Sequence, residues 1–320
     1  MSSNLHLLSF GHGYSAQALS RRLTSGKTAK NAWKITGTTR HQANYAQIGR
    51  SGADCCLWPG ADLRSKIRNA THILVSVPPD ECGDPVLRQF SVELAAAASR
   101  LKWVGVLSTT AVYGDSKGAW VDEHTPPDPT TDRGQQRIAA EQAWRTLAQR
   151  SGLRLHIFRL SGIYGPDRGP LAQIQSGKKT TQVIKHGQIF NRIHVDDIAQ
   201  ILAASIETPT PGSIYNVCDD LPAAPEDVTD FACRMLGQDP LERIDLNKAQ
   251  LSPMARSFFA ESKRVRNRLV KDDLGITLFY PDYETGLRAL IENSSTKGRG
   301  PHVSGKKSKS AAHCDTDKTE

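Results

Sequence analysis

Short apolar runs alternate with helical patterns along the first half of the chain. Several of these runs are almost continuous in Val, Ile and Leu, which is typical of strands covered on both faces of a parallel sheet. Between the runs, apolar residues recur at helical spacing, as at Ala16, Leu19 and Leu23. The runs that we expect to be strands cover residues 5–10, 33–38, 54–58, 72–77, 103–108 and 153–160.

This alternation predicts an α/β fold in which residues 1–160 form a doubly wound parallel sheet, because right-handed crossovers place helices on both of its faces. After residue 160 the pattern becomes less regular. We interpret residues 161–293 as a smaller substrate lobe, interleaved with additional strands and helices of the first domain. The elements expected there are a strand near Val183, a strand at residues 213–219, and helices around Val195, Val228 and Tyr283.

The last part of the sequence, residues 294–320, contains one Val and no Leu, Ile, Phe, Trp or Tyr. It cannot bury enough apolar surface to offset its ordering entropy, so we expect a disordered tail. Six Lys and Arg against three Asp and Glu give the tail +3 of the net charge of +8, so the tail accounts for part of the basic character. Its lysines lack interleaved aromatic residues, so nucleic acid is not an expected partner.

Composition excludes several other classes of protein. Hydrophobic residues make up 38% of the chain, and no apolar run reaches the length of a membrane span. The six cysteines are scattered without CxxC spacing and the ten histidines without paired ligand spacing, so neither a disulfide framework nor a metal site is expected. The first strand begins at Leu5 and leaves no room for a signal peptide, so we expect a cytoplasmic protein.

The first expected strand runs into a glycine turn that opens a helix, Gly11-His12-Gly13-Tyr14-Ser15-Ala16. The first glycine permits a tight turn, the second lets backbone amides approach a pyrophosphate, and the small Ala allows close packing. A glycine turn that binds nothing is the alternative, but the strand before and the helix after favour a dinucleotide site. We assign to that site Gly11, His12, Gly13, Tyr14, Ser15 and, at the end of the strand 72–77, Ser76.

The end of the second strand indicates which dinucleotide binds. A free 2′-hydroxyl on the adenosine ribose would favour an acid there, but the chain has Thr38, Thr39 and Arg40. Arg40 could pair with a 2′-phosphate, so NADP is favoured over NAD. The alternative is that Arg40 is a solvated loop residue.

Several later segments share the order and spacing of one superfamily. These are Ser108 to Gly114 (STTAVYG), Arg137 to Glu141 (RIAAE), Arg159 to Pro166 (RLSGIYGP) and Arg192 to Ala199 (RIHVDDIA). With them, the chain resembles the extended short-chain dehydrogenase/reductase superfamily, in its NAD-dependent epimerase/dehydratase branch. Residues 262–265 (SKRV) and 280–283 (YPDY) resemble its YeeZ-like subgroup. The resemblance implies a Rossmann fold, a small-molecule substrate and a homodimer.

In that superfamily a hydroxyl residue, a Tyr and a Lys act together. The resemblance assigns the hydroxyl role to Thr109, although Thr109 could equally cap the end of a strand. It places Arg137 where the family has Lys and Arg133 where it has Tyr. Because Arg stays protonated, neither residue can donate and recover a proton as a phenol does. Arg137 could still bind the nicotinamide ribose, and Arg133 should share its helix face.

Another group would then have to serve as the acid. The titratable candidates are Tyr113, Tyr164 and His194, for each of which ordinary packing is the competing interpretation. The residue that grips a diphosphate in nucleotide-sugar members is Phe190 here, which weakens the case for such a substrate unless Arg192 substitutes for it.

Two functions remain open. The first is an NADP-dependent oxidoreductase or epimerase/dehydratase-like enzyme acting on a small carbonyl or sugar-like substrate. The second is a redox-silent NADP(H)-binding sensor or scaffold, which the missing Tyr and Lys would favour.

Overall fold

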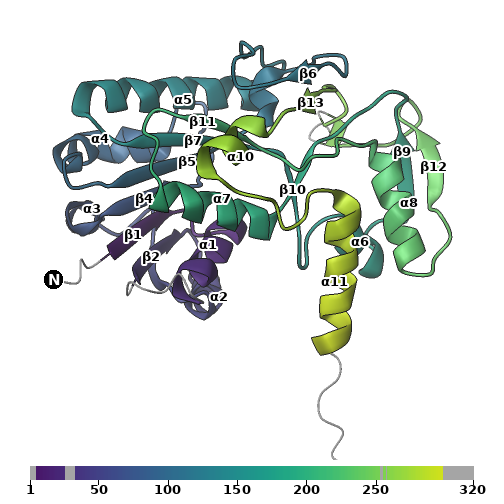
Figure 1. Cartoon of the computed structure of the whole chain (residues 1–320), viewed down its shortest axis with the longest axis horizontal. Coiled ribbons are helices and arrows are strands. Elements are labelled where there is room, and N and C mark those ends of the chain that lie inside the picture. The colour runs from purple at the N-terminus through teal and green to yellow at the C-terminus, as the bar shows by residue number, and fades with distance from the viewer. Residues whose placement is uncertain (1–4, 26–32, 253–254, 257, 298–320) are drawn as a thin grey trace, which may run out of the picture.

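A parallel sheet forms the centre of the computed structural model, which describes residues 5–25, 33–252, 255–256 and 258–297 (Figure 1). In these residues the sheet has seven strands in the order β11-β7-β5-β4-β1-β2-β3, and every neighbouring pair is parallel. The strands are β1 (Leu5–Phe10), β2 (Trp33–Thr39), β3 (Asp54–Leu57), β4 (His72–Val75), β5 (Trp103–Thr109), β7 (Leu155–Leu160) and β11 (Ile214–Val217).

This sheet confirms the predicted doubly wound α/β fold. All six strands expected in the first half of the chain are present, and the strand expected at residue 213 becomes β11, beside β7 at one edge. Residues beyond 160 therefore complete the sheet as well as forming the smaller lobe.

Helices cover both faces of the sheet (Figure 1). Alternate residues of β1 show why: Leu7 is buried in one apolar cluster and Leu8 in the other. The first cluster draws on α1 (Tyr14–Thr24), α2 (Tyr45–Arg50), α7 (Val195–Glu207) and α10 (Arg268–Leu274). The second draws on α3 (Arg64–Asn69), α4 (Pro85–Ala97) and α5 (Asp132–Ser151).

Helix α5 carries two candidate arginines, and both its ends have local causes. Thr131 caps the first turn, with its Oγ1 accepting from the amide of Gly134 at 3.2 Å. Gly152 ends the helix in the left-handed region at φ 74°. Within the helix, the indole of Trp144 donates to Asp84 Oδ2 at 2.9 Å. Since Asp84 caps α4, this bond fixes α5 against its neighbour.

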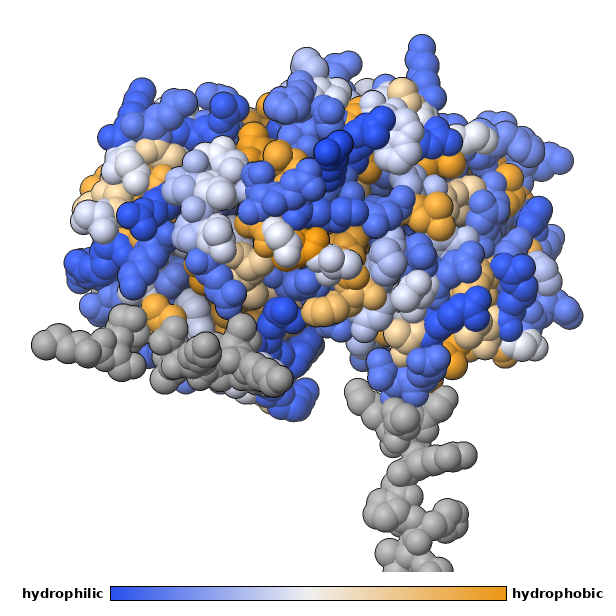
Figure 2. Space-filling model, viewed as in Figure 1, coloured by the Kyte–Doolittle hydropathy of each residue, from blue (hydrophilic) through white to orange (hydrophobic). Residues whose placement is uncertain are grey.

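The smaller lobe has an apolar cluster of its own, centred on residues such as Phe231 and Leu287. The helices of this lobe are α6 (Pro170–Gln175), α8 (Pro225–Met235) and α11 (Tyr283–Lys297), beside the paired strands β9 (Thr181–Ile184) and β12 (Glu242–Asp245). Figure 1 shows the lobe beside the sheet domain. Figure 2 shows that the surface of the whole molecule, on the face in view, is largely hydrophilic.

Short elements connect the two parts. Strand β8 (Gly162–Tyr164) pairs with β10 (Arg192–His194), and β6 (Trp120–Val121) pairs with β13 (Arg264–Val265). The short helices are η1 (Gln42–Asn44) and η2 (Thr110–Tyr113).

The predicted tail lies mostly outside the described residues. Helix α11 runs to Lys297, past the expected start of the tail at residue 294, and residues 298–320 are not described. Among the described helices, none is long and apolar enough to cross a membrane. The described residues also hold no group of three or more His, Cys, Asp or Glu able to bind a metal ion.

Candidate functional site

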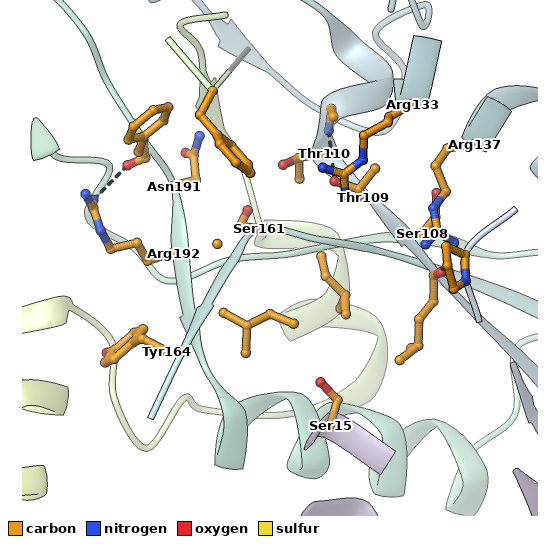
Figure 3. Close-up of a pocket in the computed structure, with 18 of the residues that line it drawn as sticks. Ser15, Ser108, Thr109, Thr110, Arg133, Arg137, Ser161, Tyr164, Asn191 and Arg192 are labelled. Atoms are coloured by element: carbon orange, nitrogen blue, oxygen red, sulfur yellow. Dashed lines mark hydrogen bonds between the residues drawn. The ribbon is translucent and has the colours of Figure 1, made fainter. Parts of the chain in front are cut away.

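A cavity of about 720 Å³ opens at the carboxyl ends of four strands of the sheet and reaches into the smaller lobe (Figure 3). Gly11 follows β1, Ser76 follows β4, Thr109 ends β5 and Ser161 follows β7, and all four residues line it. Ligands of open α/β sheets bind at this edge, where the chain crosses from one face to the other. The smaller lobe closes the opposite side through residues that include Arg168, Asn191, Arg192, Glu261 and Lys263.

The glycine turn has the geometry that its sequence predicts. Gly11 has φ +77°, and a Cβ there would lie 2.7 Å from Val77 Cγ1, so only glycine fits. Its amide donates to Thr38 Oγ1 at 2.8 Å, and Ser76 Oγ donates to its carbonyl. Gly13 is the N-cap of α1 without a side-chain cap, and a Cβ there would meet only Gly11 O at 3.9 Å. The first amides of α1 therefore remain available to a pyrophosphate, and the turn leaves room for it.

Two residues of the predicted cofactor site do not line the cavity. The side chain of His12 is buried, and its Nε2 lies 3.2 Å from both Ser51 Oγ and Ser20 Oγ. Burial lowers the pKa of His12 to about 4, so the ring is neutral at pH 7. Arg40 follows β2 with an exposed side chain outside the cavity. In the described part of the chain no carboxylate forms an ion pair with it.

The three predicted catalytic residues do meet in the cavity. Figure 3 shows Thr109 and Arg133 close together, with Arg137 further along α5. Thr109 Oγ1 accepts from the amide of Ala111 at 3.2 Å, so both its expected roles are compatible: it caps η2 and keeps its hydroxyl proton for a ligand. Burial lowers the pKa of Arg137, which donates from Nη1 to the carbonyl oxygen of Leu107 at 2.9 Å.

A buried polar network lies behind this part of the cavity. Glu141 Oε1 accepts from Ser108 Oγ at 2.5 Å, and Glu141 Oε2 forms an ion pair with Arg159 Nη2 at 2.8 Å. Arg159 Nη1 also donates to the hydroxyl of Tyr113 at 2.9 Å, which in turn donates to Asn216 Oδ1 at 2.8 Å. The network joins β5, α5, β7 and β11, and it fixes the end of β5 from which Thr109 projects.

The alternative acids occupy structural positions. The Tyr113 hydroxyl is held in the buried network and does not line the cavity. Tyr164 lines it, but burial raises its pKa well above its ordinary range, and its hydroxyl donates to Asp282 O at 3.4 Å. His194 caps α7 by accepting from the amide of Asp196 at 3.2 Å, and burial lowers its pKa to about 4.

Arg192 is buried at the edge of the cavity. Its Nη1 donates to the carbonyl oxygens of Phe190 at 3.2 Å and Ala223 at 3.1 Å, the first of which is drawn in Figure 3. Burial lowers its pKa. The guanidinium is thus held by backbone oxygens, and Phe190 supplies an apolar lining beside it.

Sequence reasoning missed Arg168, which lies beside the glycine turn. Its guanidinium carbon is 5.4 Å from the centre of the Tyr14 ring, and both residues line the cavity. The Tyr14 hydroxyl donates to the carbonyl oxygen of Pro166 at 2.8 Å, which holds this loop over the turn. A Cβ on Gly165 would lie 2.6 Å from that hydroxyl, so the close approach requires glycine. The Gly/Pro-rich composition of residues 162–170 indicated a loop but not what it contacts.

A doubly wound parallel sheet with a glycine turn after its first strand defines a Rossmann-like α/β protein. Residues 88–218 match the model of the NAD-dependent epimerase/dehydratase family, and this match confirms the resemblance to the extended short-chain dehydrogenase/reductases. The chain is 28% identical over 265 residues to protein YeeZ of Escherichia coli K12, which covers 78% of this chain and 89% of that protein.

Solved structures share the fold over nearly the whole chain. A functionally unknown conserved protein from Silicibacter pomeroyi is 50% identical, with a TM-score of 0.84 over 91% of this chain and 99% of that one. UDP-glucuronic acid 4-epimerase from Bacillus cereus, solved in complex with NAD, is 16% identical, with a TM-score of 0.71 over 91% of this chain and 99% of that one. The second likeness is one of fold alone.

Proposed function

We propose that the protein is an NADP-dependent oxidoreductase or epimerase/dehydratase-like enzyme that acts on a small carbonyl or sugar-like substrate. The observation that carries the proposal is that one cavity is lined both by the glycine turn and by the three catalytic candidates, Thr109, Arg133 and Arg137. The family match of residues 88–218, and a fold neighbour solved with NAD, support a nicotinamide dinucleotide as the cofactor.

The residues of the chain divide the work as follows. Gly11, Gly13 and Ser15 would hold the pyrophosphate at the start of α1, and Arg137 the nicotinamide ribose. The cofactor, when bound, supplies or accepts a hydride. Thr109 would donate its hydroxyl proton in a hydrogen bond to the substrate oxygen, and the charges of Arg133 and Arg137 would stabilise negative charge developing there.

The NADP preference rests on the end of β2. Arg40 is exposed there, and no acidic residue stands between Thr36 and His41. A 2′-phosphate would gain a charge-assisted contact with Arg40, whereas a ribose hydroxyl would lack the usual carboxylate acceptor.

A redox-silent NADP(H) sensor or scaffold is the second candidate, and it is favoured by Arg133 and Arg137 at the positions where the family resemblance implies Tyr and Lys. Calorimetric titration with NADPH tests the cofactor assignment that both candidates share. A panel of aldehydes, ketones and hydroxylated carbonyl compounds, followed by NADPH absorbance, then separates them. Oxidation of bound NADPH by a panel member supports the enzyme, and tight binding without oxidation by any member supports the sensor.

A further inference from the structure

Two charged side chains of the smaller lobe face the cavity at its substrate end. Lys263 and Glu261 both line it, and their side chains are only 8% and 10% exposed, so most of each side chain is removed from water. Lys263 Nζ lies 2.6 Å from Glu261 Oε2. We call these two residues the Lys263–Glu261 pair.

Further contacts fix both members of this pair. Thr130, one residue before the cap of α5, donates from Oγ1 to Glu261 Oε1 at 2.8 Å. The side chain of Asn191 donates from Nδ2 to the carbonyl oxygen of Lys263 at 2.9 Å and accepts from the amide of Val265 at 2.8 Å. The pair is therefore held beside the start of α5, the helix that carries Arg133.

The pair leaves hydrogen-bonding capacity toward the cavity. An ammonium has three N–H donors, and among the described residues Lys263 Nζ uses one of them, on Glu261. Each Glu261 oxygen accepts one bond from a described side chain and has a second lone pair. Burying an ion pair is costly, and apolar residues of the same volume often stabilise a fold as well or better. Fold stability alone therefore does not account for the Lys263–Glu261 pair, whereas contact with a ligand would.

We infer that the Lys263–Glu261 pair is a subsite for an uncharged, hydroxylated end of the substrate, a vicinal diol or a hydroxyl beside a carbonyl. One oxygen of such a group accepts from Lys263 while the adjacent hydroxyl donates to Glu261. A carboxylate has no proton to donate to Glu261, and either a carboxylate or a phosphate brings its own negative charge close to that of Glu261. The apolar ring of Phe190, which also lines the cavity, offers a surface for the C–H face of such a compound.

This inference rests on the proposed function and names the substrate class for the same cavity. Its test uses the full chain saturated with NADPH and five probes: dihydroxyacetone, xylitol, D-xylose, inorganic phosphate and malonate. Saturation-transfer NMR and titration measure binding at constant ionic strength. The variants are Lys263→Met and Glu261→Gln. The matched control is Lys271→Met, which breaks the Lys271–Asp220 ion pair (2.9 Å) outside the cavity.

At least one hydroxylated probe should bind the parent protein more tightly than phosphate or malonate. Lys263→Met and Glu261→Gln should each weaken the binding of that probe at least tenfold, while the affinity of the control Lys271→Met stays within twofold of the parent's. Should Lys263→Met fail to fold, Thr130→Val provides the second variant: it leaves both charges in place, releases Glu261 and should weaken the probe about threefold.

Three results would overturn the inference: no hydroxylated probe binds, an anionic probe binds best, or the variants bind as the parent does. The titration is repeated without NADPH, and NADPH affinity is measured separately for every variant. A failure of NADPH binding would count against the proposed function, whereas loss of probe binding with NADPH binding intact concerns the pair alone.

Discussion

Arg137 donates a 2.9 Å hydrogen bond from Nη1 to the carbonyl oxygen of Leu107, two residues before Thr109. The bond joins α5 to the end of β5, so the position of one predicted catalytic residue depends on another. A lysine at this position would present a single ammonium on a flexible stem, whereas the planar guanidinium can hold Leu107 with one N–H and direct others into the cavity. Arg137 therefore joins helix to strand and also lines the cavity.

The substitution at these two positions gives the first prediction. The double variant Arg133→Tyr with Arg137→Lys introduces the Tyr and Lys that the family resemblance leads us to expect at these positions. If the protein is an enzyme that uses another acid, turnover of the substrate found by the panel should fall by roughly ten- to a hundredfold, because the positive groups near the substrate oxygen are removed. A redox-silent binder should instead bind NADPH as the parent does and gain at most a trace of carbonyl reduction.

Steady-state kinetics and NADPH calorimetry measure both results. Arg145→Lys, an exposed change on the same helix outside the cavity, is the matched control. Turnover unchanged by the double replacement would show that neither arginine takes part in the chemistry.

The second prediction concerns cofactor choice. The protein should bind NADPH at least tenfold more tightly than NADH, since a charge-assisted contact between Arg40 and the 2′-phosphate is worth about 1.5 to 3 kcal/mol. Arg40→Ala should abolish most of this preference in calorimetric titrations. Arg50→Ala, also exposed, controls for the loss of one positive charge. Equal affinities for the two cofactors in the parent protein would contradict the assignment.

The third prediction tests the loop that Tyr14 holds over the glycine turn. Arg168→Gln should weaken binding of NADPH and ADP-ribose about tenfold, because Arg168 lies beside the glycine turn and is expected to contact the pyrophosphate there. The affinity of the Arg168→Gln variant for 2′-AMP should equal that of the parent protein, since 2′-AMP lacks the pyrophosphate. Fluorescence or calorimetric titration of the three ligands measures this. Arg150→Gln, exposed on α5 and outside the cavity, should leave all three affinities unchanged. An equal loss for 2′-AMP would place Arg168 elsewhere in the binding site.

The fourth prediction concerns pH. His156 is fully buried, accepts from the amide of Thr210 at 3.0 Å, and has its pKa lowered by burial to about 4 from an ordinary value of 6.5. The unfolded chain therefore binds a proton that the folded chain does not, so stability is present above pH 6.5 and is lost as the pH falls toward 4. The shifted pKa of His156 should therefore lower the free energy of unfolding by about 3 kcal/mol at pH 4, relative to its value well above pH 6.5.

Urea unfolding at pH 7.5, 6, 5 and 4 measures the pH dependence. The Gln side chain in His156→Gln can still accept from the Thr210 amide through its amide oxygen. The variant should take up as much as one proton fewer on unfolding, so its free energy of unfolding should depend less steeply on pH, whatever its value at pH 7.5. His41→Gln, at an exposed position, should leave the slope unchanged. A parent protein whose stability does not fall between pH 6 and pH 4 would contradict the prediction.

Much of the fold and part of the site follow from local sequence. Continuous apolar runs must be covered on both faces, so the strands around Leu7 and Ile73 could be recognised without knowing their neighbours. The glycine turn could be recognised because only glycine tolerates the φ of +77° at Gly11. Arg133 and Arg137 both line the cavity, because residues four apart share a helix face.

The rest depended on tertiary structure. Nothing local to Lys263, Glu261 or Arg168 shows that they line the same cavity as Thr109, because they reach it from loops whose positions are set by packing between the lobe and the sheet. His12 shows the converse. Its place in the turn was evident from sequence, but its side chain lies against Gly37, where an added Cβ would lie 2.4 Å from the His12 ring, and does not line the cavity. Sequence thus determined the elements and the turn chemistry, whose causes are local. The end of the cavity that holds the Lys263–Glu261 pair was instead decided by contacts between distant residues, 72 positions apart for Asn191 and Lys263 and 131 for Thr130 and Glu261.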